Sequence, residues 1–182
     1  GDVYKRQALA CAMLDPRIAS SPSKLRASSS TSISTTPLTL EQVFEYFMEM
    51  DEARELLTDI SKLSPSELLF VVDVRLPRSE MDWARKKVRL TRKGWGGAYS
   101  MIRYRMDRAA LGKDPYTNYT FQEILDEGGI CMDQAYFAVN TAKCNGIPSA
   151  YVTGDGNRGP HAWVNLLTTD ETWQSYGGYG YN

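Results

Sequence analysis

The chain has 182 residues, of which 42% are apolar and 24% charged, and its formal net charge at pH 7 is −1. These values are ordinary for a globular protein with a sizeable core, and they exclude the strongly basic surface typical of nucleic-acid-binding proteins. No apolar run approaches the roughly 20 residues of a membrane-spanning helix, and the length predicts one domain, or one domain with an appendage.

Three cysteines and one histidine are few for a chain of this length. The cysteines are odd in number and unrelated in spacing, which disfavours a disulfide framework. They also lack the paired spacing of a zinc site. No metal or cofactor is therefore expected.

The first part of the chain is expected to lie outside the folded domain. Residues 1–7, GDVYKRQ, resemble a translated sequencing adaptor, and we treat them as foreign to the protein. Residues 8–37 contain too few large apolar side chains to offset the entropy of ordering, so a disordered segment rich in Ser and Thr is predicted. The folded domain is expected at 38–182, with its motif-bearing part at 120–182.

Two interpretations of the apolar run ALACAML at 8–14 stay open. It is the remnant of a secretory signal, which would place the protein outside the cytoplasm, or a short apolar helix of a cytoplasmic protein. In the first case the natural start of the chain is missing. The run YGGYGYN at the other end stops within an expected strand or turn, so the C-terminus is also a candidate for truncation.

Four helix starts carry capping signals in the first half of the domain. In each, a Ser or Thr stands three residues before a Gln, Glu or Asp, the spacing of a capping box. The pairs are Thr39–Gln42, Ser64–Glu67, Ser79–Asp82 and Thr120–Glu123, and the helices predicted after them run to residues 60, 74, 93 and 127. A further helix is expected over 98–111.

After Gly129 the pattern changes to one helix followed by three strands. The helix ICMDQAYFAVNTAKCN is expected to stop at Gly146, followed by Pro148. The runs SAYVTG, HAWVNLL and WQSYGGYGY are expected strands, the last two paired antiparallel, and DGNRGP is expected to be a loop. Helices followed by a helix packed on an antiparallel sheet make an α+β fold.

Cys131 and His161 stand at the starts of two of these elements. At a helix N-terminus, the partial positive charge and the backbone N–H groups favour a thiolate and could stabilise a tetrahedral oxyanion. The two glycines before Cys131 are expected to let a substrate backbone approach. A strand start is a rigid mount for an imidazole that acts as general base for the thiol. Taken singly, each residue is more often structural, as a buried thiol or a packed histidine.

The whole order of features resembles the transglutaminase-like superfamily of cysteine enzymes, which have a papain-like core. The family pattern is a Gly-x-Cys helix start, a helix ending in Gly-Ile-Pro, a strand ending in Gly, and His-Ala-Trp-Val on the next strand. These features occur here in that order between Gly128 and Trp173. The resemblance implies that Cys131 is the nucleophile and His161 the general base, that no metal is required, and that the source is bacterial.

The third member of the triad is not evident. In the family, an Asp that orients the histidine stands a few residues after a Trp on the next strand. Trp173 matches that Trp, and counting onward from it places the expected Asp at about Gly177. No acid lies between Trp173 and Asn182. The amide of Asn182 or Gln174 could orient the imidazole instead. An offset strand, an acid beyond a truncated end or a catalytically weak member would equally account for the missing acid.

Trp95, Asp155 and Asn157 are further candidates, because they could line the substrate cleft. Core packing is the competing interpretation for Trp95, and a polar turn is the competing interpretation for the other two.

Several other residues have structural interpretations. Cys144 and Trp163 are expected in the core, Cys11 outside the domain, and Asp133 as a stabiliser of its helix. The nine Lys and Arg residues between 85 and 108 are expected to form a solvated face, with binding of an acidic polymer as the alternative.

Together these features predict acyl transfer through a thioester on a peptide or protein substrate. Hydrolysis, by a protease or amidase, is expected more than cross-linking by a transglutaminase-type acyltransferase. The alternative is a catalytically inactive domain of the same fold that serves as a binding or scaffolding module, and the missing acid motivates it.

Overall fold

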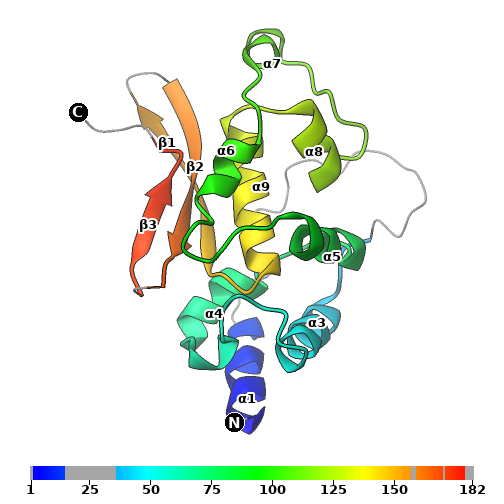
Figure 1. Cartoon of the computed structure of the whole chain (residues 1–182), viewed down its shortest axis with the longest axis vertical. Helices are drawn as coiled ribbons and strands as arrows, with labels where there is room; N and C mark the ends of the chain where they lie inside the picture. Colours follow the sequence, from blue (N-terminus) through cyan, green and yellow to red (C-terminus); the bar gives the residue numbers. More distant parts are fainter. Residues whose placement is uncertain (1, 15–35, 157–158, 170, 179–182) are drawn as a thin grey trace.

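The computed structural model describes residues 2–14, 36–156, 159–169 and 171–178 (Figure 1). Its helices are α1 (Asp2–Met13), α3 (Leu40–Glu52), α4 (Pro65–Val72), α5 (Arg78–Lys87), α6 (Gly97–Met101), α7 (Met106–Leu111), α8 (Phe121–Glu127) and α9 (Cys131–Cys144), with a short 3-10 turn, η1 (Ile60–Lys62). The strands are β1 (Ser149–Gly156), β2 (Gly159–Leu167) and β3 (Trp173–Tyr176). Helices precede one small antiparallel sheet, so the predicted α+β fold is confirmed.

The sheet has the order β1-β2-β3. Gly154 lies opposite His161, and Val164 lies opposite Tyr176. On β2, Ala162, Val164 and Leu166 are buried, while His161, Trp163 and Asn165, which alternate with them, are partly exposed. One face of the sheet therefore packs into the core. The loop expected at 155–160 is shorter than predicted, because β1 and β2 together include four of its six positions.

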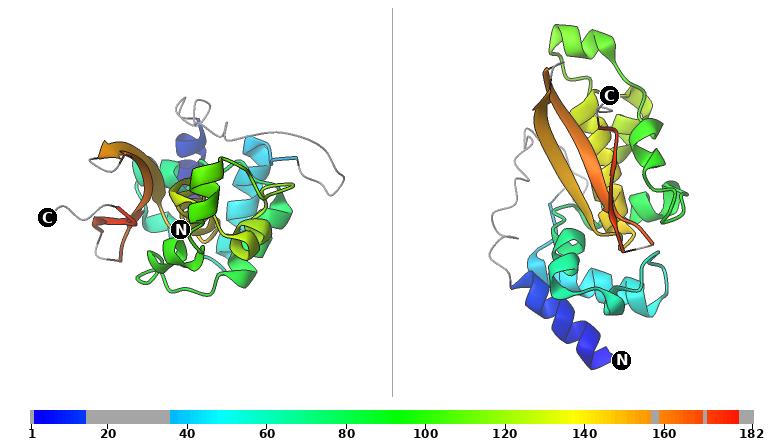
Figure 2. Two further views of the ribbon diagram at one scale, coloured as in Figure 1. Left: turned by 90° about the horizontal axis from the view of Figure 1, so that it is seen from above. Right: turned by 90° about the vertical axis from the view of Figure 1, so that its left-hand side faces the viewer.

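Helix α9 is the centre of the domain. It lies between the sheet and the other helices, as the views in Figures 1 and 2 show. Ten of its residues are buried, and seven of them are small or apolar: Ala135, Phe137, Ala138, Val139, Thr141, Ala142 and Cys144. A helix buried on most of its faces needs such residues, because they let neighbouring elements approach closely.

Three of the four predicted caps are confirmed. Thr39, Ser64 and Thr120 each accept from the backbone N–H three residues later, in complete capping boxes. The fourth is wrong: α5 begins at Arg78, after Pro77, without a side-chain cap. Four predicted helices also end early or divide: α3 ends at Glu52, α4 at Val72 and α5 at Lys87, and the 98–111 segment divides into α6 and α7.

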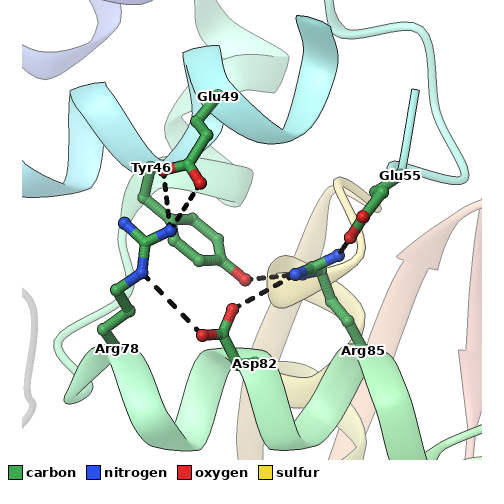
Figure 3. Close-up of polar contacts among 6 residues, drawn as sticks. All are labelled: Tyr46, Glu49, Glu55, Arg78, Asp82 and Arg85. Atoms are coloured by element: carbon green, nitrogen blue, oxygen red, sulfur yellow. Dashed lines mark hydrogen bonds and ion pairs between the residues drawn. The ribbon is translucent and has the colours of Figure 1, made fainter. Parts of the chain in front are cut away.

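Asp82, expected in that fourth cap, instead belongs to a polar cluster that joins α3 to α5 (Figure 3). The Arg85 guanidinium donates to Tyr46 Oη at 2.7 Å and to Asp82 Oδ1 at 3.1 Å, and it forms an ion pair with Glu55. Arg78 binds Glu49 at 2.6 Å. The Arg85 side chain is only 7% exposed. The predicted solvated basic face is therefore wrong at Arg85.

Helix α1 packs on the domain through Leu9, Ala12 and Met13, which are buried against neighbours that include α4 and α3. Arg6 also forms an ion pair with Glu52 at 3.0 Å. The predicted disordered segment therefore does not begin at residue 8; residues 15–35 lie outside the described part of the chain, and a foreign origin of residues 1–7 stays a prediction. None of the helices described is both long and apolar enough to span a membrane.

Candidate active site

Cys131 is the first residue of α9 and is partly exposed. In the first turn of the helix, the backbone N–H groups of Asp133 and Gln134 both donate to Ile130 O at 3.0 Å. The N–H groups of Cys131 and Met132 precede them and have no acceptor inside the helix. The thiol therefore lies beside two backbone donors, at the positive end of a 14-residue helix.

The two glycines before Cys131 serve the fold itself. Gly128 has φ +73°, and a Cβ there would lie 2.4 Å from Arg103 O. A Cβ on Gly129 would lie 2.5 Å from the Asp133 carboxylate and 2.6 Å from Tyr116 Oη. The expectation that they admit a substrate backbone is therefore corrected, because protein atoms already fill the space beside both of them.

Asp133 fixes the start of α9. Its carboxylate accepts from Ile130 N at 2.7 Å and from Tyr119 Oη at 2.8 Å, and it forms an ion pair with Arg108. The residue is 1% exposed. The helix-stabilising role predicted for Asp133 is confirmed, and these contacts hold the turn that carries Cys131 in place.

His161 is the third residue of β2. Its Nε2 lies 2.5 Å from Gly177 O, and its ring stacks on Trp163 with the centroids 6.1 Å apart and the planes inclined by 21°. Trp163 finds room because Gly154, the partner of His161 in the register, has no side chain; a Cβ there would lie 3.0 Å from the indole. Trp163 is thus partly exposed beside the histidine, and its predicted place in the core is wrong.

Gln174, one of the two amides proposed for the third position, lies away from His161. Gln174 lies opposite Leu166 on the sheet, and its Oε1 accepts from Tyr176 Oη at 2.7 Å. Asn182 lies outside the described residues. A backbone carbonyl, that of Gly177, meets the imidazole at the position where the family pattern has an acid.

The thiol and the imidazole lie at the same end of the sheet. The C-terminal part of α9 contacts the start of β1, through Ser149 Oγ and Val139 O at 3.0 Å, so α9 and β2 both begin at the opposite end (Figure 1). The core-facing residues of β2 pack on α9, whereas His161 shares the other face with Trp163. The two groups therefore approach this end from the two sides of the sheet.

Tyr151 is a neighbour of Cys131 that the sequence did not single out. It lies opposite Val164, on the sheet face that packs on α9. Its hydroxyl is buried and has no hydrogen-bond partner among the described residues. Burial, with a smaller contribution from the nearby Cys131 thiolate, raises the pKa of Tyr151 to about 12. Because the hydroxyl stays protonated, it is a hydrogen-bond donor beside the nucleophile. The only sequence signal for the position of Tyr151 was the alternation of side chains between the two faces of β1.

Trp95, Asp155 and Asn157 are the remaining candidates. Trp95 is completely buried, and its indole N–H donates to Ala138 O of α9 at 3.3 Å, so of its two interpretations core packing is correct and cleft lining is not. Asp155 is exposed on β1 opposite Pro160, and Asn157 is not among the described residues.

The other cysteines also lie away from the site. Cys144 is buried at the far end of α9, as predicted, and burial raises its pKa strongly. Cys11 is exposed on α1. Within the described parts of the chain, no three His, Cys, Asp or Glu side chains are grouped so as to hold a metal ion.

Comparison with known proteins identifies the family of the chain. The model of the transglutaminase-like superfamily matches residues 81–177, more than half of the chain. Among solved structures, the chain is similar to a "Putative Cysteine Protease from Cytophaga hutchinsonii", with 18% identity and a TM-score of 0.47 over 68% of this chain and 46% of that one. The chain thus spans less than half the length of that protein. No curated protein matches it. The family match runs from within α5 to just past the end of β3 and includes Cys131 and His161, and the chain therefore belongs to the transglutaminase-like superfamily.

Proposed function

We propose that the protein is a cysteine enzyme that transfers acyl groups from peptide or protein amides through a thioester. Cys131 attacks the amide carbonyl, His161 takes the thiol proton and delivers it to the departing amine, and water or an amine then releases the acyl group. The N–H groups of Cys131 and Met132 bind the oxyanion of the tetrahedral intermediate. Hydrolysis is the favoured outcome.

The observation that carries the proposal is the position of Cys131 as the first residue of α9. The turn is fixed by the buried Asp133, the thiol is partly exposed, and two backbone donors adjoin it. Cys144, on the same helix, has none of these properties, because it is fully buried. One helix therefore holds one thiol that substrate can reach and one that it cannot.

The first test measures the reactivity of Cys131 toward iodoacetamide between pH 5 and 9. Cys11→Ser removes the exposed thiol of α1, so Cys131 becomes the accessible thiol among the three and Cys131→Ala gives the background. We expect His161→Gln to slow labelling at pH 6 by about tenfold or more, because general-base assistance is lost. Equal rates in the presence and absence of the imidazole would contradict the nucleophile–base pair.

A second test separates hydrolysis from cross-linking. The protein is incubated with glutamine-containing proteins and peptides in the presence of a fluorescent primary amine. Release of ammonia or peptide fragments without amine incorporation supports hydrolysis, and amine incorporation supports cross-linking. If Cys131 is reactive in the first test but neither product forms across a broad peptide set, the alternative of a non-catalytic binding module gains support, since the absence of an acid at Gly177 favours it.

A further inference from the structure

The imidazole of His161 has a definite hydrogen-bond partner in this structure. Its Nε2 lies 2.5 Å from the main-chain oxygen of Gly177, within hydrogen-bond distance. A carbonyl oxygen can only accept, so Nε2 must carry the proton of this bond. In the neutral ring, Nδ1 is then the nitrogen with the lone pair. The bond thus fixes which nitrogen can take a proton from Cys131.

The backbone of Gly177 is shaped for this contact. Its φ is +78°, which an L side chain rarely adopts, and β3 has already ended at Tyr176. The chain leaves the register here, so the carbonyl points toward His161 rather than along the sheet. Glycine is the residue that takes up such a turn at little cost.

Tyr99 occupies the space in which a side chain at position 177 would begin. A Cβ on Gly177 would lie 2.5 Å from two atoms of the Tyr99 ring and 2.6 Å from a third. The ring is itself anchored, because Tyr99 Oη donates to Ala162 O at 3.0 Å and the residue is buried. A carboxylate could enter only if the ring moved, and the ring is held to the strand that carries His161.

Trp163 covers the same imidazole from a third direction. Its ring stacks on His161, and Gly178 Cα lies beside the indole, since a Cβ there would be 3.9 Å away. The bond, the tyrosine and the stacked indole form one unit around the ring.

We propose that the main-chain carbonyl of Gly177 positions His161 as the base for Cys131, at the place where the family pattern has a side-chain acid. This inference rests on the proposed function for its catalytic meaning. Gly177 acts through the imidazole, so it is a positioning residue. Tyr99 supports it by filling the place of a side chain and by bracing β2.

The chain offers a clean spectroscopic probe, because His161 is its only histidine. In protein labelled with 15N at histidine and with 13C at the glycine carbonyl carbons, the ring gives one set of signals. We expect the neutral ring to be the Nε2–H tautomer with a slowly exchanging Hε2 proton, and a coupling across the hydrogen bond to the Gly177 carbonyl carbon. An Nδ1–H tautomer, or an Hε2 that exchanges as fast as in a free peptide, would overturn the proposal on the wild-type protein alone.

The variants separate this inference from the proposed function. Gly177→Ala forces a Cβ against Tyr99 and should displace the carbonyl, so protection of Hε2 is lost and iodoacetamide labelling of Cys131 at pH 6 slows roughly fivefold. Gly178→Ala is the matched control, because its Cβ makes an ordinary contact, and it should keep both properties. Circular dichroism verifies that each variant is folded.

The outcomes are distinct. In one outcome, His161→Gln slows labelling of Cys131, whereas Gly177→Ala loses Hε2 protection but labels at the wild-type rate. The Cys131–His161 pair then acts without the carbonyl, so the inference fails while the proposed function stands. If Hε2 is protected in the wild type but His161→Gln leaves labelling unchanged, the function fails and the carbonyl has only a structural role. Loss of both Hε2 protection and labelling rate in Gly177→Ala, but not in Gly178→Ala, supports both.

Discussion

Replacement of Gly128 by Ala tests how rigidly the chain holds the start of α9. Gly128 has φ +73° and ψ 179°, a conformation essentially restricted to glycine, in which a side chain costs about 1–3 kcal/mol. Its Cβ would also lie 2.4 Å from Arg103 O, a backbone atom that is itself held by Gly129 N at 2.9 Å. The clash cannot be relieved by a side-chain rotation. We expect Gly128→Ala to lower the free energy of unfolding by about 3 kcal/mol or more.

Two matched glycines divide this loss into its parts. Gly112 has φ +63°, but a Cβ there would meet no atom within 4 Å, so Gly112→Ala measures the cost of the left-handed backbone alone, about 1 kcal/mol. Gly97 lies in α6 with a negative φ and open space, so Gly97→Ala should be neutral or stabilising by up to about 1 kcal/mol.

Urea unfolding followed by tryptophan fluorescence and far-ultraviolet circular dichroism gives the three free energies by linear extrapolation. The iodoacetamide rate of Cys131, measured on the same samples without urea, reports whether the helix start has moved. A Gly128→Ala protein as stable as Gly112→Ala, within about 0.5 kcal/mol, would refute the argument that close packing against Arg103 requires glycine.

Three further predictions concern buried polar groups. Arg85→Ala should destabilise the protein by about 3 kcal/mol because it leaves Asp82 and Tyr46 without their buried partner. Arg78→Ala changes a side chain that is 46% exposed, so it should lower the free energy of unfolding by at most about 1 kcal/mol. Urea unfolding measures both losses. Tyr151→Phe removes a hydroxyl without a described partner, so stability should be unchanged or higher, and slower iodoacetamide labelling of Cys131 would show that the hydroxyl assists the thiolate. Burial lowers the pKa of Lys143 below its ordinary 10.5, so the unfolded state binds more protons between the two values and stability should rise with pH up to about 10.5; Lys143→Met should remove this rise in urea titrations at pH 7 to 10.

Local signals in the sequence predicted local structure well. The capping boxes at Thr39, Ser64 and Thr120 succeed because they depend only on atoms within four residues. The one at Ser79 fails because Asp82 has stronger partners in Arg85 and Arg78, which tertiary packing brings to it. Helix ends were predicted less well for the same reason, since contacts with distant residues decide where a helix stops.

Prediction of the candidate site was limited in a different way. The positions of Cys131 and His161 at element starts were visible as patterns of glycine, proline and apolar residues. The acceptor for His161 was not, because a main-chain carbonyl belongs to every residue and only the turn at Gly177 brings this one to the ring. Trp95 was equally ambiguous, since its burial depends on α9 packing over it.

The central position of α9 has a consequence for synthesis of the protein on the ribosome. Its apolar faces are covered on one side by helices that precede it in the chain, but on the other side by a sheet whose strands are translated after it. A nascent chain that has not yet released β2 therefore exposes a largely apolar helix to other chains, and partly made proteins of this kind are prone to aggregate. Pairing between β1 and β2, which are adjacent in sequence, shortens the time during which α9 is exposed, because contacts between near neighbours in the chain form fastest.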